Sequence, residues 1–149
     1  MDQKLVPFLM FEAGAREAAE FYVSVFPDGR LLPSEGPGVA FELGGVRFEA
    51  FDGGPRFTFS DGTSFLIRCE TQAEVDHYWE RLLEGGGQES RCGWLKDRFG
   101  VSWQVVPTAL PRLLSDPDPE RARRAQEAML TMSKLDVAAL EAAADGREA

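Results

Sequence analysis

Apolar residues along the chain alternate between short continuous runs and segments with helical spacing. Leu5–Phe11 is a short apolar run, typical of a buried strand. Ala15–Phe26 follows with apolar residues on one face at helical spacing, and Pro27-Asp28-Gly29 ends this predicted helix. Residues 30–38 contain two prolines and two glycines, which predict a loop with a short strand.

Two further apolar segments, Val39–Leu43 and Val46–Phe51, flank the pair Gly44-Gly45. Two glycines between two alternating segments are a signal for a β-hairpin with a two-residue turn, because such turns need positive φ angles. The first part of the chain therefore predicts one unit of strand, helix and further strands.

The same order recurs in the second part. Ser64–Cys69 is an apolar run, and Thr71–Leu83 is an amphipathic helix in which Thr71 and Glu74 form a capping box. Gly85-Gly86-Gly87 ends this helix. The strands expected after it are Gln88–Cys92, Trp94-Leu95 and Val101–Val106, with a turn at Asp97–Gly100 before the last one.

The two parts align with each other as an internal repeat. A shift of 56 residues places Tyr22 on Tyr78 and Gly29 on Gly85, and a shift of 55 places residues 45–50 on residues 100–105. The sequence therefore predicts an α+β domain over residues 1–107, built from two βαβββ units at about 5–55 and 63–107.

Residues 108–149 lie beyond the repeat and predict a C-terminal helical extension. Asp118 with Pro119, and later Asp136, are helix N-terminal signals. Met129 and Met132 recur at helical spacing, which is typical of core packing or of a surface that faces a partner.

Composition narrows the classes of function. The chain has 149 residues, a formal net charge of -9 and a pI near 4.6, which argues against binding nucleic acid or anionic membranes. It has two cysteines, Cys69 and Cys92, and its first residues show no signal-peptide pattern. We therefore expect a cytoplasmic protein.

Three segments carry a resemblance to a known family. These are Cys92–Pro107, Glu17–Tyr22 and Leu135–Glu141. They resemble PhnB-like proteins, a branch of the vicinal-oxygen-chelate superfamily of glyoxalases, bleomycin-resistance proteins and dihydroxybiphenyl dioxygenases. The resemblance implies a cupped mixed sheet with helices on its convex face, a small-molecule ligand in the cup, and a homodimer.

Some members of this branch carry the description 3-demethylubiquinone-9 3-methyltransferase. A methyltransferase with a Rossmann fold needs a glycine-rich loop after its first strand to hold the nucleotide cofactor. Gly85-Gly86-Gly87 follows a predicted helix instead. The sequence does not support the activity in that description.

Metal-dependent members of the superfamily take ligands from the first and last strands of each unit. The equivalent positions here are Glu49 and Gln104, with first-strand positions near Pro7 and Thr63, within one residue. This set contains one carboxylate and no imidazole, and the single histidine, His77, lies in a predicted helix. Transition metals usually need several such ligands, so we expect no tightly bound metal and no other cofactor. Weak binding of Mg²⁺ or Ca²⁺ through Glu49 and Gln104 stays open, although the ligand positions do not indicate it.

Strand alternation separates the last strand of each unit into two faces. Arg47 and Glu49, with Ser102 and Gln104, occupy the face opposite the helices, where the resemblance predicts a cavity. Trp94 and Lys96 lie just before the last strand and are candidates for one wall. These six residues form the predicted ligand-binding set, and the sequence identifies no catalytic residue.

Three functions remain open from the sequence. The protein binds a small organic molecule in the cup, with no reaction assigned. Alternatively, it is a metal-assisted lyase, isomerase or dioxygenase of the glyoxalase type, or a drug-sequestering resistance protein that binds without turnover.

Overall fold

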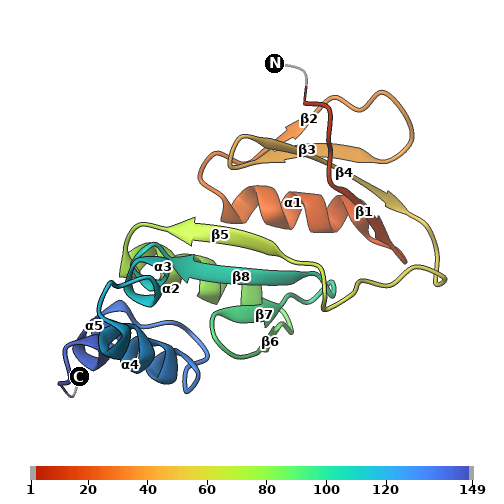
Figure 1. Cartoon of the computed structure of the whole chain (residues 1–149). Coiled ribbons are helices and arrows are strands. Elements are labelled where there is room, and N and C mark those ends of the chain that lie inside the picture. Colours follow the sequence, from red (N-terminus) through yellow and green to blue (C-terminus); the bar gives the residue numbers. More distant parts are fainter. Residues whose placement is uncertain (1–2, 148–149) are drawn as a thin grey trace. The chain divides into compact units, whose positions relative to one another are not determined.

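A computed structural model describes residues 3–147 of the chain. The chain divides into two compact units, residues 1–59 and 60–149, and each is described by itself (Figure 1). Both have the element order and sheet topology that the internal repeat predicts, so the prediction of two βαβββ units is confirmed. None of the helices within residues 3–147 has the length and hydropathy needed to cross a membrane.

The first unit is a four-stranded mixed sheet with one helix. Its strands lie in the order β1-β4-β3-β2, with β1 parallel to β4 and the other pairs antiparallel. The bounds are β1 Phe8–Phe11, α1 Ala15–Val25, β2 Arg30–Leu32, β3 Val39–Leu43 and β4 Val46–Asp52.

Local sequence signals fix the shape of this unit. Gly44 and Gly45 have φ angles of 57° and 80°, the pair of positive values that a type I′ hairpin needs, and Leu43 pairs with Val46 across the turn. The core forms where α1 covers the sheet: the ring of Tyr22 lies 6.1 Å from that of Phe41, which stacks on Phe48 at 5.3 Å.

The second unit repeats this topology, with strand order β5-β8-β7-β6 and β5 parallel to β8. Its elements are β5 Phe65–Cys69, α2 Gln72–Leu83, β6 Gln88–Glu89, β7 Trp94–Lys96 and β8 Ser102–Pro107. Thr71 accepts a hydrogen bond from the backbone N–H of Glu74 at 3.2 Å, as the capping box predicts. β6 is shorter than expected, because the chain turns away before Cys92, whose φ is 59°.

The turn before β8 is held by one buried carboxylate. Asp97 is 3% exposed and accepts hydrogen bonds from the backbone N–H groups of Phe99 and Val101 and from the Trp103 indole N–H. These distances are 2.9, 3.1 and 2.8 Å. The carboxylate therefore joins the turn to the largest fully buried side chain in the unit.

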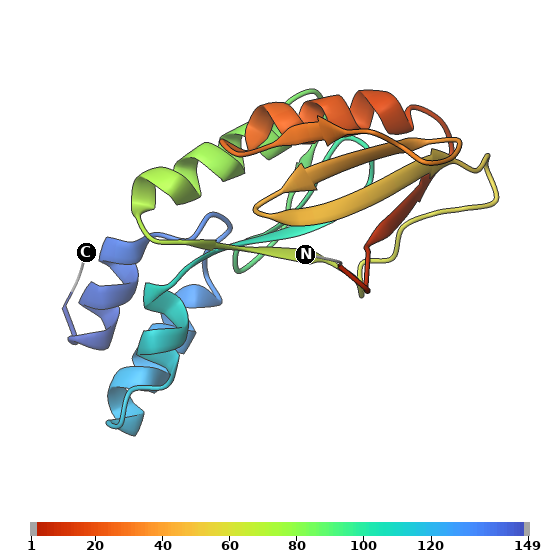
Figure 2. The same ribbon diagram turned by 90° about the horizontal axis from the view of Figure 1, so that it is seen from above.

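Three helices follow β8 and belong to the second unit (Figures 1 and 2). They are α3 Ala109–Leu114, α4 Pro119–Met129 and α5 Val137–Ala144. Asp118 and Asp136 cap α4 and α5 as expected. The helices and the segment between α4 and α5 share a hydrophobic cluster of their own: Leu110, Leu113, Ala125, Leu135, Leu140 and Ala144.

Hydrogen bonds attach the C-terminal segment to α2 and to the turn before β7. The backbone N–H groups of Cys92 and Gly93 donate to the carbonyl groups of Met132 and Ser133 at 2.8 and 2.9 Å. Gln72 of α2 donates to the Leu135 carbonyl at 3.0 Å and accepts from the Val137 N–H at 2.8 Å. The extension is thus fixed against the second unit.

Candidate functional site

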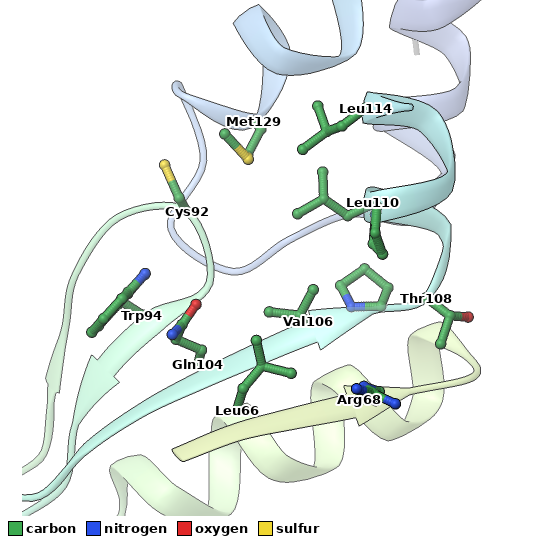
Figure 3. A pocket seen from close by; sticks show the side chains of 12 residues that line it. Leu66, Arg68, Cys92, Trp94, Gln104, Val106, Thr108, Leu110, Leu114 and Met129 are labelled. Atoms are coloured by element: carbon green, nitrogen blue, oxygen red, sulfur yellow. The ribbon is translucent and has the colours of Figure 1, made fainter. Parts of the chain in front are cut away.

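The main candidate site is a cavity of about 740 Å³ in the second unit (Figure 3). It lies on the face of the second sheet opposite α2, here called the open face. Its lining is Leu66, Arg68, Cys92, Trp94, Gln104, Val106, Pro107, Thr108, Leu110, Pro111, Leu114 and Met129.

Strand alternation makes the floor of this cavity. In β5, Ile67 and Cys69 are buried toward α2, so Leu66 and Arg68 project from the open face. In the sheet register Leu66 is paired with Gln104, and Gln104 with Trp94. These residues therefore form one row across three strands.

The C-terminal helices make the opposite wall. Figure 3 shows Leu110 and Leu114 of α3 and Met129 of α4 directed toward the floor. Their packing rests on the hydrophobic cluster of the extension, which Val106 and Met129 also contact. The cavity consequently exists because the extension folds over the open face.

Few polar groups enter this apolar space. The Gln104 side-chain amide donates to the Ser64 hydroxyl at 2.9 Å. As far as the described residues go, its carbonyl oxygen and its second N–H have no partner and are available to a ligand. Trp94 is half-buried beside it. An apolar lining with a few polar groups is typical of sites for small organic molecules.

Two more of the predicted residues, Lys96 and Ser102, line a smaller polar cavity of about 270 Å³ on the same face. Trp94 borders both cavities. Lys96 makes an ion pair with Asp61 at 2.8 Å, and Ser102 is buried at 5% exposure. The structure thus places four of the six predicted residues on the open face of the second sheet, divided between two cavities.

The remaining two, Arg47 and Glu49, lie in the first unit. Arg47 Nε donates to Glu49 Oε2 at 3.0 Å, and both side chains are partly exposed. Neither residue lines the cavities described above. The two side chains form an ion pair with each other.

The residues at the superfamily's metal positions do not fit a transition metal. Glu49 accepts from Arg47, and Gln104 directs an amide N–H, which is not a metal ligand, at Ser64. Within residues 3–147 no three His, Cys, Asp or Glu side chains gather as a metal site would require. His77 lies in α2 with its ring 5.0 Å from that of Tyr78.

Sequence reasoning did not identify Leu66, Arg68 or the residues from the C-terminal extension. Alternation within Ser64–Cys69 contained the signal for Leu66 and Arg68, since they are out of phase with the buried residues. No local pattern marked Leu110, Leu114 or Met129, because they become cavity walls only through packing onto another element.

The comparisons with known proteins agree with this architecture. The profile of a family described as 3-demethylubiquinone-9 3-methyltransferase matches residues 3–106. A search of curated proteins found no significant match.

Among solved structures, a PhnB protein from Bacillus cereus described as a 3-demethylubiquinone-9 3-methyltransferase is similar, with 32% identity and a TM-score of 0.64. The match covers 71% of this chain and 100% of that one. A Pseudomonas aeruginosa protein matches at 24% identity and a TM-score of 0.59, covering 71% and 98% of the two chains.

The fosfomycin resistance protein FosX from Mesorhizobium loti shares the fold at 18% identity and a TM-score of 0.54, covering 76% and 99%. The repeat, the two sheets and the matching profile lead to one assignment. The chain belongs to the PhnB-like family described as 3-demethylubiquinone-9 3-methyltransferase.

Proposed function

We propose that this protein binds a small organic molecule in the 740 Å³ cavity on the open face of its second sheet. The observation that carries the proposal is the cavity itself: apolar walls from two sides surround a few polar groups. Its volume lies in the range of about 300–1,000 Å³ that is usual for sites of small ligands. The two cysteines are free thiols, which supports a cytoplasmic location for this function.

Gln104 is the residue that would orient a ligand in the site. It lies in the central row of the floor and is partly buried, and Ser64 holds one of its amide hydrogens. The neutral amide offers a ligand both a donor and an acceptor at a fixed place. A ligand that lost this contact would leave polar groups unpaired in an apolar cavity, which weakens binding.

A thermal-shift screen of small metabolites, followed by calorimetry of the hits, tests the proposal. We expect Gln104→Leu to weaken binding by about 1–3 kcal/mol while the fold remains intact. Gln88→Leu is the matched control, since Gln88 lies on the same sheet but borders the smaller cavity. Hits that bind wild type and Gln104→Leu with equal affinity would contradict this site.

We assign no reaction. The lining holds one thiol, Cys92, and, within the described residues, no histidine or carboxylate that would act as its base. A glyoxalase-type enzyme and a drug-sequestering protein would both bind their ligand in such a cavity. The enzyme would convert the ligand, whereas the sequestering protein would release it unchanged. Recovery of a bound hit unchanged after prolonged incubation favours binding alone, whereas conversion of the hit favours an enzyme.

A further inference from the structure

Two polar side chains at one end of the cavity have no hydrogen-bond or ion-pair partner among the described residues. Arg68 is exposed at the end of β5, and within residues 3–147 it makes no hydrogen bond or ion pair. Thr108 occupies the N-cap position of α3, yet within the described chain its hydroxyl makes no capping hydrogen bond and no other hydrogen bond. Both line the cavity.

The sheet register brings these two residues to the same end of the site. Arg68 is paired with Val106 in the parallel ladder between β5 and β8. The Thr108 backbone N–H donates to the carbonyl of Cys69, the residue after Arg68, at 2.9 Å. Figure 3 shows Arg68 and Thr108 at the side of the cavity away from Trp94 and Gln104.

The charge of Arg68 is unusual in this chain, because most basic side chains in the second unit are neutralised by carboxylates. Arg81, Arg112, Arg121, Arg123, Lys96, Lys134 and Arg147 all make ion pairs. Arg68 is the charged residue of the cavity lining, and the described lining contains no carboxylate. The described lining therefore offers no carboxylate to pair with a cationic ligand, whereas an anionic ligand could pair with the Arg68 guanidinium.

We propose that the ligand is an organic anion with an apolar body. Its acid group binds the Arg68 guanidinium and the Thr108 hydroxyl at the end of the cavity away from Trp94 and Gln104. Its body lies on Leu66 and Val106 beneath Leu110. This inference rests on the proposed function, because it names the ligand class of the same site.

The spacing of the polar groups adds a second requirement. Gln104 is paired with Leu66, and Arg68 lies two residues further along β5. Two residues of strand correspond to about 7 Å. A ligand that satisfies both ends carries a hydrogen-bonding group roughly this far from its acid group, about the length of one substituted aromatic ring.

Two fluorescent probes with the same aromatic body test the charge requirement. Anilinonaphthalene sulfonate carries an anionic group, and phenylnaphthylamine lacks it. We expect the anionic probe to lose about threefold to tenfold in affinity in Arg68→Gln, the loss of one charge-assisted contact. The neutral probe should change by less than about twofold. Added salt should weaken the anionic probe alone, because it screens the pair.

Two variants locate and control the effect. Arg91→Gln removes the same charge from an exposed residue outside the lining and should leave both affinities unchanged. Leu66→Glu places a carboxylate on the cavity floor, at a residue that is 50% exposed, and should weaken both probes without unfolding the protein.

The outcomes separate the two proposals. If Leu66→Glu weakens the binding of both probes but Arg68→Gln leaves the affinity of the anionic probe unchanged, the inferred ligand class is wrong and the proposed binding site is retained. If Leu66→Glu changes the affinity of neither probe, or if neither probe binds the wild-type protein, the cavity is not a binding site and both proposals are overturned.

Discussion

The two thiols of the chain lie in opposite environments. Cys69 is fully buried in β5, and burial, with a smaller contribution from the nearby Glu74 carboxylate, raises its pKa to about 12. Cys92 is partly exposed and lines the main cavity. Since the thiolate is the reactive form, the two cysteines should differ in reactivity.

We therefore expect iodoacetamide at pH 8 to modify Cys92 and to spare Cys69 in the folded protein. Mass spectrometry of the intact chain should show one added group, which is lost in Cys92→Ser and kept in Cys69→Ser. A ligand in the cavity should slow the reaction, because it covers the Cys92 side of the wall. Modification of Cys69 before unfolding would contradict this assignment.

Asp97 is the residue on which the last turn of the second unit depends. Removal of its carboxylate leaves two backbone N–H groups and the Trp103 indole N–H without their acceptor. We expect Asp97→Ala to lower the free energy of unfolding by about 2–3 kcal/mol, measured by urea denaturation.

Asp61→Ala is the control for this effect. Asp61 also carries a carboxylate, but its side chain is 78% exposed in its ion pair with Lys96. Exposed pairs contribute less than about 1 kcal/mol. Equal losses in the two variants would show that Asp97 has no special role in the turn.

At the scale of elements, the contact between α2 and the C-terminal extension helps to hold the second wall of the main cavity in place. Gln72 is central to it, because one side chain contacts Leu135, Val137 and Asp76 through hydrogen bonds of 3.0, 2.8 and 3.1 Å. We expect Gln72→Ala to destabilise the protein by about 1–3 kcal/mol and to weaken ligand binding.

The exposed Gln126 in α4 provides the control, and Gln126→Ala should change stability by less than about 0.5 kcal/mol. Hydrogen exchange gives a direct measurement: amides of residues 132–137 should lose protection in Gln72→Ala. Retained protection there would mean that the hydrophobic cluster alone fixes the extension.

The same contact has a pH dependence through Asp76. The hydrogen bond from Gln72, and then Lys134, lower the pKa of this carboxyl below its usual 3.8. A lowered pKa in the folded state means that the contribution is complete above pH 3.8 and is lost as the pH falls through the folded value. The stability difference between wild type and Asp76→Asn should accordingly shrink in acid.

At the scale of the whole molecule, we expect a homodimer. Each four-stranded unit ends in edge strands, and apolar side chains remain exposed, including Phe8 at 54%, Leu130 at 50% and Val46 at 40%. Pairing of two copies would cover such surface.

Light scattering at micromolar concentration should give twice the chain mass of 16.5 kDa. If the surface of α4 contributes to the interface, Leu130→Asp should shift the equilibrium toward the monomer. A mass of 16.5 kDa across the accessible concentration range would refute the dimer.

The sequence by itself determined the elements and their repetition, because their signals are local. Gly44-Gly45 fixed a hairpin through its φ angles, Thr71 and Asp136 marked helix starts through their caps, and alternation in β8 separated Gln104 from Trp103. These features depend on neighbours within a few residues, so they can be predicted without knowing the rest of the chain.

Tertiary structure alone decided which side chains meet on the open face. Gln104 shares a cavity with Arg68 through the pairing of β5 with β8, and with Met129 through the fold of the extension. Arg47 and Glu49, predicted on the same pattern, lie in the first unit and form an ion pair with each other. The alternation of side chains along a strand predicts which of them point away from the hydrophobic core. Contacts between residues distant in sequence then determine whether these side chains face water, one another or a ligand.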